Sequence, residues 1–427
     1  MLSLGWLLLV VGALGGAPEG PESAYNDAGY ISVGSKGHEL FYWLFESRND
    51  PSKDPVLIWL SGGPGCSSML ALFTENGPYQ IENDELVVNN YSWNTNATAV
   101  WVDQPAGTGF SRGVPVHDED QVASDMVDFL QGLFARYPKY SKLPLYVFGE
   151  SYAGHYVPAV SAAVLSETSL RLVGAAIGNG LTVPEVQYKY YKPYAEAHDL
   201  VSDAVLGLMS GVEIICEPLI AACNGNRSVV DDDLTTRVLK WTDCINAYVF
   251  CNIGEITPVE STGVNVYDVR RPCGPYELCY DFSAVDTYLN RDDVQAALGV
   301  SKEWEECSHL VDLVMVYGGD WVKTFGGDVA RLLDAGIKVL VYAGEYDFMC
   351  NWLGNRAWTA DLDWTGKDAF NAAPNVTYAL DDATVVGSYV SASNFTFLKV
   401  ADAGHLAPHD QPKTTLAMVQ RFLFGAY

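Results

Sequence analysis

Short runs of consecutive apolar residues recur along the chain and predict strands buried on both faces. A sheet covered by helices on both sides gives its strands no polar face, whereas a half-exposed strand alternates apolar and polar residues. Between these runs, apolar residues recur at helical spacing, so strands and helices alternate as in a parallel sheet. The predicted strands are Pro55–Leu60, Ala99–Asp103, Leu145–Gly149, Leu172–Ile177, Ile337–Gly344 and Phe395–Val400, with an early hairpin at Tyr30–Trp43 and helices at Asp120–Tyr137, His155–Leu165 and Thr414–Phe424.

The character of the chain changes between Val183 and Tyr317. This region is rich in cysteine and tyrosine, and helical patterns occur at Val201–Met209 and Leu234–Trp241 among short irregular segments. We therefore expect an insertion domain at residues 183–317. It would separate a first part of an α/β core, residues 25–182, from a second part, residues 318–427.

Residues 1–17 predict a cleaved secretory signal peptide. The apolar run Leu2–Ala17 is too short to span a bilayer with margin and ends in small residues, and a buried N-terminal helix is the alternative because no lysine or arginine precedes it. No later stretch predicts a membrane span. Five N-x-Ser/Thr sequons, where glycans attach in the secretory pathway, agree with this prediction; they are at Asn90, Asn96, Asn226, Asn375 and Asn394.

The nine cysteines also suit an oxidising compartment, where disulfide bonds persist. An odd number leaves at least one thiol unpaired. Spacing alone does not assign the bonds, because Cys216, Cys223, Cys244 and Cys251 by themselves allow three connectivities. A zinc site is the rival interpretation, but these spacings do not suit a C-x₂₋₄-C motif.

Composition indicates a globular protein whose net charge disfavours binding to polyanions. Hydrophobic residues make up 49% of the chain and charged residues 18%, which excludes a disordered chain or a coiled coil. With 53 acidic and 25 basic residues, the formal net charge is −28. This charge repels phosphates and anionic lipids, so neither nucleic acid nor an anionic membrane surface is an expected partner.

A serine stands where a predicted strand turns into a predicted helix. Gly149-Glu150-Ser151-Tyr152-Ala153 approximates the G-x-S-x-G nucleophile elbow, with alanine at the fifth position. In that turn the serine side chain is pushed out above the sheet. A solvated turn serine is the alternative when the motif is considered by itself.

A glycine-rich loop follows another predicted strand. Gly62-Gly63-Pro64-Gly65 comes directly after Pro55–Leu60, and its glycines allow backbone N–H groups to approach a ligand closely. Phosphate binding is disfavoured because the loop lacks a Gly-Lys-Ser/Thr ending and has no nearby positive residue.

Three candidate catalytic side chains stand at the carboxyl ends of predicted strands, in the chain order Ser151, Asp347, His405. Ligands and catalytic groups collect at that edge of open α/β sheets. The order is that of the α/β-hydrolase triad. His405 would take the proton of Ser151 and return it to the leaving group, and Asp347 would orient the imidazole and stabilise its cation.

The motifs resemble the serine carboxypeptidase family, and within it the fungal carboxypeptidase Y group most strongly. The resemblance covers about Tyr30 to Phe424. It is carried by Gly62-Gly63-Pro64-Gly65-Cys66-Ser67-Ser68, by Gly149–Tyr156, by Ala343–Gly354 and by Ala403-Gly404-His405. It implies an α/β-hydrolase fold, a mostly parallel central sheet flanked by helices, with a disulfide-rich and largely helical insertion or cap domain. It implies no metal and no cofactor.

The resemblance also assigns roles to residues around the triad. It implies an oxyanion hole from the N–H groups of Gly63 and Tyr152, a site for the substrate's free carboxylate, an apolar substrate pocket and four disulfide bonds with Cys350 left free. This chain has Ser61 where similar chains usually have asparagine, and Leu406 where methionine is common. The implied carboxylate site is Ser61, Gly62, Glu75 and Glu150; the pocket is Leu181, Tyr188, Tyr191, Trp321, Met349 and Cys350; the disulfides are Cys66–Cys307, Cys216–Cys251, Cys223–Cys244 and Cys273–Cys279.

The expected function is a serine-type carboxypeptidase that cleaves the C-terminal peptide bond of peptides and proteins through an acyl-enzyme. Apolar pocket residues favour hydrophobic residues near the C-terminus. Two crowded glutamates favour acidic pH, where one stays protonated and can donate a hydrogen bond to the substrate carboxylate. An acyltransferase with the same triad and a non-catalytic secretory glycoprotein are the alternatives. The expected destination is the vacuole, the lysosome or the extracellular space. The sequence predicts no particular oligomeric state.

Overall fold

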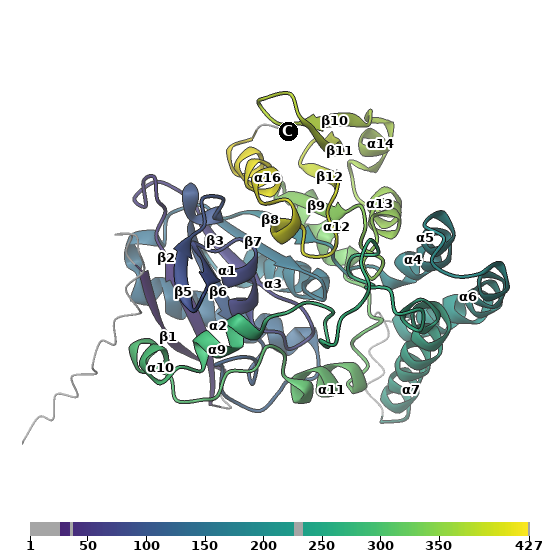
Figure 1. Ribbon diagram of the computed structural model, residues 1–427, viewed down its shortest axis with the longest axis horizontal. Coiled ribbons are helices and arrows are strands. Elements are labelled where there is room, and N and C mark those ends of the chain that lie inside the picture. Colours follow the sequence, from purple (N-terminus) through teal and green to yellow (C-terminus); the bar gives the residue numbers. More distant parts are fainter. Residues whose placement is uncertain (1–25, 35–36, 226–233, 426–427) are drawn as a thin grey trace, which may run out of the picture.

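The computed structural model describes residues 26–34, 37–225 and 234–425, and its centre is a ten-stranded sheet (Figure 1). The strand order is β1-β2-β6-β3-β7-β8-β9-β12-β11-β10, in which β6, β3, β7, β8, β9 and β12 run parallel and the outer strands pair antiparallel. These strands are β1 (Asn26–Val33), β2 (His38–Phe45), β3 (Val56–Leu60), β6 (Thr98–Asp103), β7 (Leu145–Glu150), β8 (Leu172–Gly178), β9 (Lys338–Gly344), β10 (Val376–Ala379), β11 (Val385–Ala392) and β12 (Phe395–Val400).

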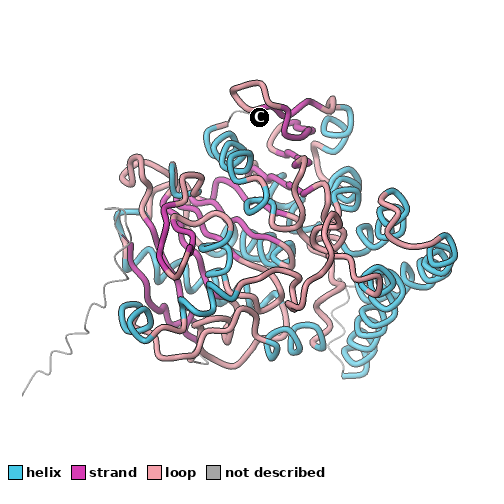
Figure 2. The backbone as a smooth tube through the Cα atoms, in the orientation of Figure 1, coloured by secondary structure: helices cyan, strands magenta, loops and turns pink. Residues whose placement is uncertain are grey.

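Helices cover both faces of this sheet, so its central strands are buried as their apolar runs predicted (Figure 2). One face packs on α2 (Glu119–Arg136), α3 (Ala153–Glu167) and α12 (Gly326–Asp334), and the opposite face packs on α1 (Ser68–Thr74), α9 (Ser283–Leu289), α10 (Asp292–Leu298) and α16 (Pro412–Phe424). The chain therefore has the expected α/β-hydrolase architecture. All three predicted core helices are present, each extended or shifted at its ends by a few residues.

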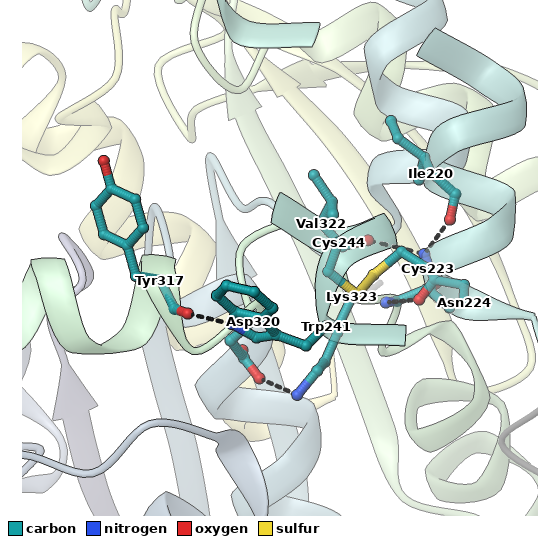
Figure 3. Close-up of a disulfide and its surroundings, with 10 residues drawn as sticks. Ile220, Cys223, Asn224, Trp241, Cys244, Tyr317, Asp320, Val322 and Lys323 are labelled. Carbon is teal, nitrogen blue, oxygen red and sulfur yellow. Dashed lines mark hydrogen bonds and ion pairs between the residues drawn. A yellow bond between two sulfur atoms is a disulfide. The ribbon is translucent and has the colours of Figure 1, made fainter. Parts of the chain in front are cut away.

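The region between β8 and β9 is mainly helical and carries most of the disulfide bonds. Cys216–Cys251 and Cys223–Cys244 join α6 to α7, and Asn224 at the end of α6 bonds the backbone of Val322 and Thr324 (Figure 3). The helices described there are α4 (Pro184–Gln187), η3 (Tyr188–Tyr190), α5 (Tyr191–Ala197), α6 (Asp203–Asn224), α7 (Leu234–Cys251), the π-helix η4 (Asn252–Ile256), α8 (Thr257–Glu260), α9, α10, α11 (His309–Tyr317) and α12.

Two of these helices differ from the sequence prediction in length. The patterns at Val201–Met209 and Leu234–Trp241 are only the first parts of α6 and α7. By length and composition α6 could cross a membrane, contrary to the expectation that no stretch beyond the first 17 residues could do so. Its two disulfide bonds to α7 tie it to another helix of the region between β8 and β9, and it carries the acidic residues Glu213 and Glu217.

Several short elements were not predicted. β10 and β11 lie at the edge of the sheet, where most of their residues are half-buried or exposed and no long apolar run forms. Other elements that no pattern predicted are α1, β4 (Tyr79–Glu82), β5 (Glu85–Val88), η1 (Trp93–Thr95), η2 (Pro138–Tyr140), α13 (Trp352–Asp361), α14 (Lys367–Ala372) and α15 (Ala407–Asp410). Between β8 and β9, only α6 and α7 were predicted among the helices that the structure describes. The predicted signal peptide, residues 1–17, and the sequon at Asn226 lie outside the described residues.

Candidate active site

Ser151 occupies a tight turn between β7 and α3. Its φ angle is +66°, a left-handed conformation that non-glycine residues rarely adopt, and its backbone is held by bonds from Ser151 N–H to the Gly178 carbonyl (3.0 Å) and from Leu181 N–H to the Ser151 carbonyl (3.1 Å). A Cβ on Gly149 would come within 2.6 Å of the Cβ of Ala153 and of the Leu60 carbonyl oxygen. Glycine at position 149 therefore permits the close approach of β7 to the start of α3 and to the end of β3 that the nucleophile elbow requires.

Asp347 and His405 lie in the loops that follow β9 and β12, and they are hydrogen-bonded to each other. The Nδ1 atom of His405 is 2.8 Å from Oδ2 of Asp347, and both side chains are buried. Oδ2 also accepts bonds from Asn179 Nδ2 (2.8 Å) and from the Cys350 backbone N–H (3.2 Å). A carboxylate oxygen accepts hydrogen bonds, so this contact suits the tautomer in which Nδ1–H of His405 is the donor, and that tautomer would leave Nε2 free to accept a proton.

The glycine-rich loop after β3 packs directly against the elbow. A Cβ on Gly62 would lie 2.4 Å from the backbone nitrogen of Tyr152 and 2.7 Å from the Glu150 carbonyl oxygen. Gly63 has a φ of +111° and lines the same pocket as Ser151 and Tyr152. The loop and the elbow thus bring Gly63 and Tyr152 into the wall of one pocket with Ser151.

Glu75 and Glu150 meet on one side of Ser151, at the end of α1 and the end of β7. Both are almost fully buried, and their carboxyl groups are hydrogen-bonded to each other. Burial raises the pKa of both groups, and the charge of Glu75 raises the pKa of Glu150 further. One oxygen of each carboxyl has no hydrogen-bond partner among the residues that the structure describes. The pair can therefore hold a proton and still offer an oxygen to a ligand.

Ser61 and Gly62 lie beside this pair, and all four residues line one pocket with Ser151 and His405. The Ser61 hydroxyl accepts a bond from Trp59 Nε1 (3.1 Å). The short hydroxyl leaves more room there than an asparagine amide would. Unpredicted side chains complete this pocket: Leu70, Thr74, Tyr267, Leu278, Tyr280 and Phe282.

A second pocket shares Ser151 with the first and is mainly apolar. It contains five of the six predicted residues, Leu181, Tyr191, Trp321, Met349 and Cys350. The sixth, Tyr188, stands behind the wall, where its hydroxyl accepts a bond from Trp321 Nε1 (3.0 Å). Cys350 is the free cysteine, and burial raises the pKa of its thiol well above the ordinary value.

Sequence patterns did not single out Asn179 or Tyr267. Asn179 follows β8 in a Gly-Asn-Gly turn with a φ of +40°. An asparagine between two glycines at the end of a predicted strand indicates a tight turn, and this pattern was the one sequence feature that pointed to Asn179. Tyr267 lies in the irregular region after α8, where periodicity carries no information. Its ring packs 5.1 Å from that of His405, and it lines both pockets.

Among the described residues, two groups of side chains have the spacing to hold a metal ion, but their chemistry disfavours metal binding. In Asp347, Cys350 and His405, the raised pKa keeps the sulfur as a thiol, which is a poor ligand. In Glu119, His155 and Asp320, the Lys323 ammonium donates to Asp320 (2.8 Å) and already supplies a positive charge (Figure 3). The absence of a metal or cofactor stays a prediction.

The four disulfide bonds have the pairing that the resemblance implied: Cys66–Cys307, Cys216–Cys251, Cys223–Cys244 and Cys273–Cys279. The sequons at Asn90 and Asn375 are exposed, and that at Asn96 is half-buried. Asn394 differs because its amide donates to the carbonyls of Leu333 (2.9 Å) and Ile337 (2.7 Å), so a glycan there would break an existing contact.

Comparison with known proteins agrees with this geometry. Residues 18–425 match the profile of the serine carboxypeptidase family. The chain is 41% identical over 410 residues to carboxypeptidase Y of Komagataella phaffii, covering 94% of this chain and 76% of that protein. It is 40% identical over 425 residues to serine carboxypeptidase-like 48 of Arabidopsis thaliana, covering 96% of this chain and 80% of that protein.

The fold is similar to that of a solved relative. The crystal structure of Kex1Δp, a prohormone-processing carboxypeptidase from Saccharomyces cerevisiae, superposes with a TM-score of 0.81. That comparison covers 96% of this chain and 94% of the other at 24% sequence identity.

Proposed function

The chain belongs to the serine carboxypeptidase family and is a serine-type carboxypeptidase, and from this premise we propose that Ser151, His405 and Asp347 hydrolyse the C-terminal peptide bond. The observation that carries the assignment is the buried hydrogen bond between Asp347 and His405, whose side chain lines one pocket with Ser151. The three side chains come from three strand ends at one edge of the sheet.

The reaction proceeds in two halves. Nε2 of His405 takes the hydroxyl proton of Ser151 as Oγ attacks the carbonyl carbon, and the same proton passes to the leaving amine when the C–N bond breaks. Water then attacks the acyl-enzyme, with His405 again taking a proton and returning it to Ser151. Asp347 keeps the Nδ1 proton in place and stabilises the imidazolium.

The N–H groups of Gly63 and Tyr152 would bind the negative oxygen of each tetrahedral intermediate. Support comes from the contact between the glycine-rich loop and the elbow, which brings both backbones beside Ser151. Donors held in place before the reaction need no reorganisation when charge develops, which is why such a site lowers the barrier.

Ser61, Gly62, Glu75 and Glu150 would hold the free carboxylate of the substrate, which makes the enzyme an exopeptidase. They line the pocket on the leaving-group side together with Ser151 and His405. A protonated glutamate donates a hydrogen bond to a carboxylate, whereas two ionised glutamates repel it. The raised pKa of both groups therefore supports carboxylate binding at acidic pH.

The second, apolar pocket would take the side chain of the penultimate residue. Aromatic and sulfur-containing walls favour hydrophobic side chains there, because polar groups would lose their hydration without finding partners. Peptides and proteins with free C-termini are thus the proposed partners.

An acyltransferase with the same triad is the second candidate, since an alcohol could replace water on the acyl-enzyme. The paired glutamates favour the peptidase, because they suit a peptide carboxylate. A purely structural glycoprotein is the third candidate. Peptide hydrolysis by the wild type and by Ser151→Ala distinguishes the three: we expect serine-dependent release of C-terminal amino acids without added alcohol, and turnover that survives Ser151→Ala would contradict the assignment.

We also infer passage through the secretory pathway. Four disulfide bonds and exposed sequons at Asn90 and Asn375 support it. Vacuolar or lysosomal delivery and secretion both fit these features. Imaging and fractionation of the full-length chain carrying a C-terminal tag would separate the two destinations.

A further inference from the structure

Residues 265–271 form a closed loop, which we call the strap, between α8 and the Cys273–Cys279 disulfide. Its ends are joined by a bond from Asn265 N–H to the Arg271 carbonyl (2.8 Å) and by a β-bridge between Val264 and Pro272. Inside it, the Asn265 side chain accepts a bond from Tyr267 N–H (2.8 Å). The strap is therefore held in shape by its own hydrogen bonds.

The strap binds the loop that carries Asp347. Val269 N–H donates to the Tyr346 carbonyl (3.0 Å), and Phe348 N–H donates to the Val266 carbonyl (3.0 Å). These bonds fall on the residues immediately before and after Asp347. The strap thus fixes the backbone on both sides of this carboxylate.

The strap also binds the loop that carries His405. The N–H of His405 donates to the Tyr267 carbonyl (2.7 Å), and the two rings pack against each other. The Asp347 and His405 loops contact each other directly through Tyr346 N–H and the Ala403 carbonyl (2.8 Å). The bond from His405 N–H to the strap therefore adds a second backbone contact that holds the His405 loop in place.

Arg270 connects the strap to the far side of the His405 loop. Its guanidinium donates two bonds to Asp268 (2.7 and 2.9 Å), one to Asp410 (3.2 Å) and one to the Asp402 carbonyl (3.0 Å), and it lies over the Tyr346 ring (4.7 Å). The carboxylates of Asp268 and Asp410 are almost fully buried, whereas the Arg270 side chain is 30% exposed.

Asp410 passes this connection to the catalytic loop. The carboxylate oxygen that Arg270 approaches also accepts the N–H of Gly404, at 2.6 Å. Gly404 directly precedes His405. The planar guanidinium of Arg270 therefore donates to both carboxylates and to the backbone carbonyl of Asp402. A lysine ammonium, which is a compact point charge, would not match this geometry.

We propose that Arg270 is a positioning residue for the carboxypeptidase reaction, clamping the strap onto the Asp347 and His405 loops so that His405 stays aligned with Asp347 and Ser151. Arg270 touches no reacting atom. The proposal rests on the triad of Ser151, His405 and Asp347 proposed above. It adds a residue that lines neither pocket and that governs the alignment of these three side chains.

Arg291 offers a closely matched control in the same insertion region. It donates two bonds to Asp293 (3.0 and 2.6 Å), one to the Asp84 carbonyl (3.3 Å), and lies over the Tyr288 ring (5.6 Å). Its side chain is 41% exposed. The two arginines thus make the same types of contact, but Arg291 touches neither catalytic loop.

The test compares Arg270→Gln with Arg291→Gln. With a C-terminally blocked ester substrate, we expect Arg270→Gln to lower kcat by roughly 10- to 100-fold with KM changed less than about twofold, because small misplacements of catalytic groups cost this much. Phosphonate labelling of Ser151 should slow in parallel, and the far-downfield proton resonance of the His405–Asp347 hydrogen bond should shift or broaden. Arg291→Gln should leave all three as in the wild type.

A kcat and a proton resonance for folded Arg270→Gln equal to those of Arg291→Gln would overturn the proposal. Thermal unfolding checks that both variants are folded. If Arg270→Gln does not fold, Arg270→Lys replaces it in the same comparison with Arg291→Gln. This variant keeps the positive charge but loses the planar guanidinium. Failure of the triad assignment has a different signature: Ser151→Ala would then retain the turnover of the wild type.

Discussion

At the scale of single residues, Glu75 and Glu150 show how burial sets chemistry. Water is excluded from both carboxyl groups, so ionising them is costly, and ionising the second beside the first costs more. Such a pair titrates as a unit at a pH above the ordinary range for glutamate. The same residues on the surface would be ionised at any pH where the enzyme is expected to work.

The first prediction follows from this pair. As pH rises through the titration of Glu75 and Glu150, the site gains negative charge and repels the substrate carboxylate, so kcat/KM for peptides with free C-termini should fall. Hydrolysis of C-terminally blocked esters should persist over the same range. Steady-state pH profiles for both substrate types measure the difference.

Glu150→Gln should flatten the decline for free peptides. Glu255→Gln is the matched control, because Glu255 is also a buried glutamate whose pKa is raised by burial, to about 8, yet it lines neither pocket. If free and blocked substrates gave the same pH profile in the wild type, these glutamates would not bind the C-terminus.

At the scale of elements, the site depends on two turns that pack without side chains between them. The loop after β3 meets the elbow after β7 at Gly62, where any Cβ would collide with backbone atoms of Tyr152 and Glu150. Backbone atoms cannot move aside as a flexible side chain can. This contact brings the loop that carries Gly63 against the turn that carries Tyr152, the two residues of the proposed oxyanion hole.

Gly62→Ala should therefore displace the loop and lower kcat by about 10²–10³, the usual effect of losing one oxyanion-hole donor. Gly327→Ala in α12 is the control, because a Cβ there would meet nothing within 4 Å. Measurements of kcat and of thermal unfolding on both variants separate a local effect from loss of the fold. Activity of Gly62→Ala at the wild-type level would mean that the loop donates no essential hydrogen bond.

At the scale of the whole molecule, several carboxyl groups are buried with raised pKa values because water is excluded from them. They contribute stability that is fully present below about pH 4, their unfolded range, and is lost as pH rises through the folded pKa. The net charge of −28 acts in the same direction through self-repulsion. The groups are Glu75, Asp103 (pKa about 6), Glu119, Glu150 and Glu255 (about 8).

The protein should consequently be more stable in mild acid than at alkaline pH. We expect Tm to decrease from pH 5 to pH 8, and Glu255→Gln, which removes one of these groups, to make the decrease smaller. Thermal unfolding followed by circular dichroism at constant ionic strength measures both. A Tm that rises over this interval would show that the buried carboxyl groups do not dominate the pH dependence.

Much of this protein was determined by local sequence. Strands buried on both faces must be apolar at every position, so β3, β6 and β7 were visible as continuous runs. Tight turns need glycine, so the loop at Gly62 and the elbow at Gly149 were visible too. Parallel strands end at one edge, and for that reason the chain order of Ser151, Asp347 and His405 was enough to predict their approach.

Only the tertiary structure decided the contacts between segments far apart in the chain. Cys66 and Cys307 are 241 residues apart, and the partner of each was implied by resemblance and not by spacing. The strap lies in an irregular region without periodicity, and its bonds to the Asp347 and His405 loops are made largely by backbone groups, which every residue type carries. A pattern of side chains records which face of an element is buried, but it does not record which distant backbone a loop will meet.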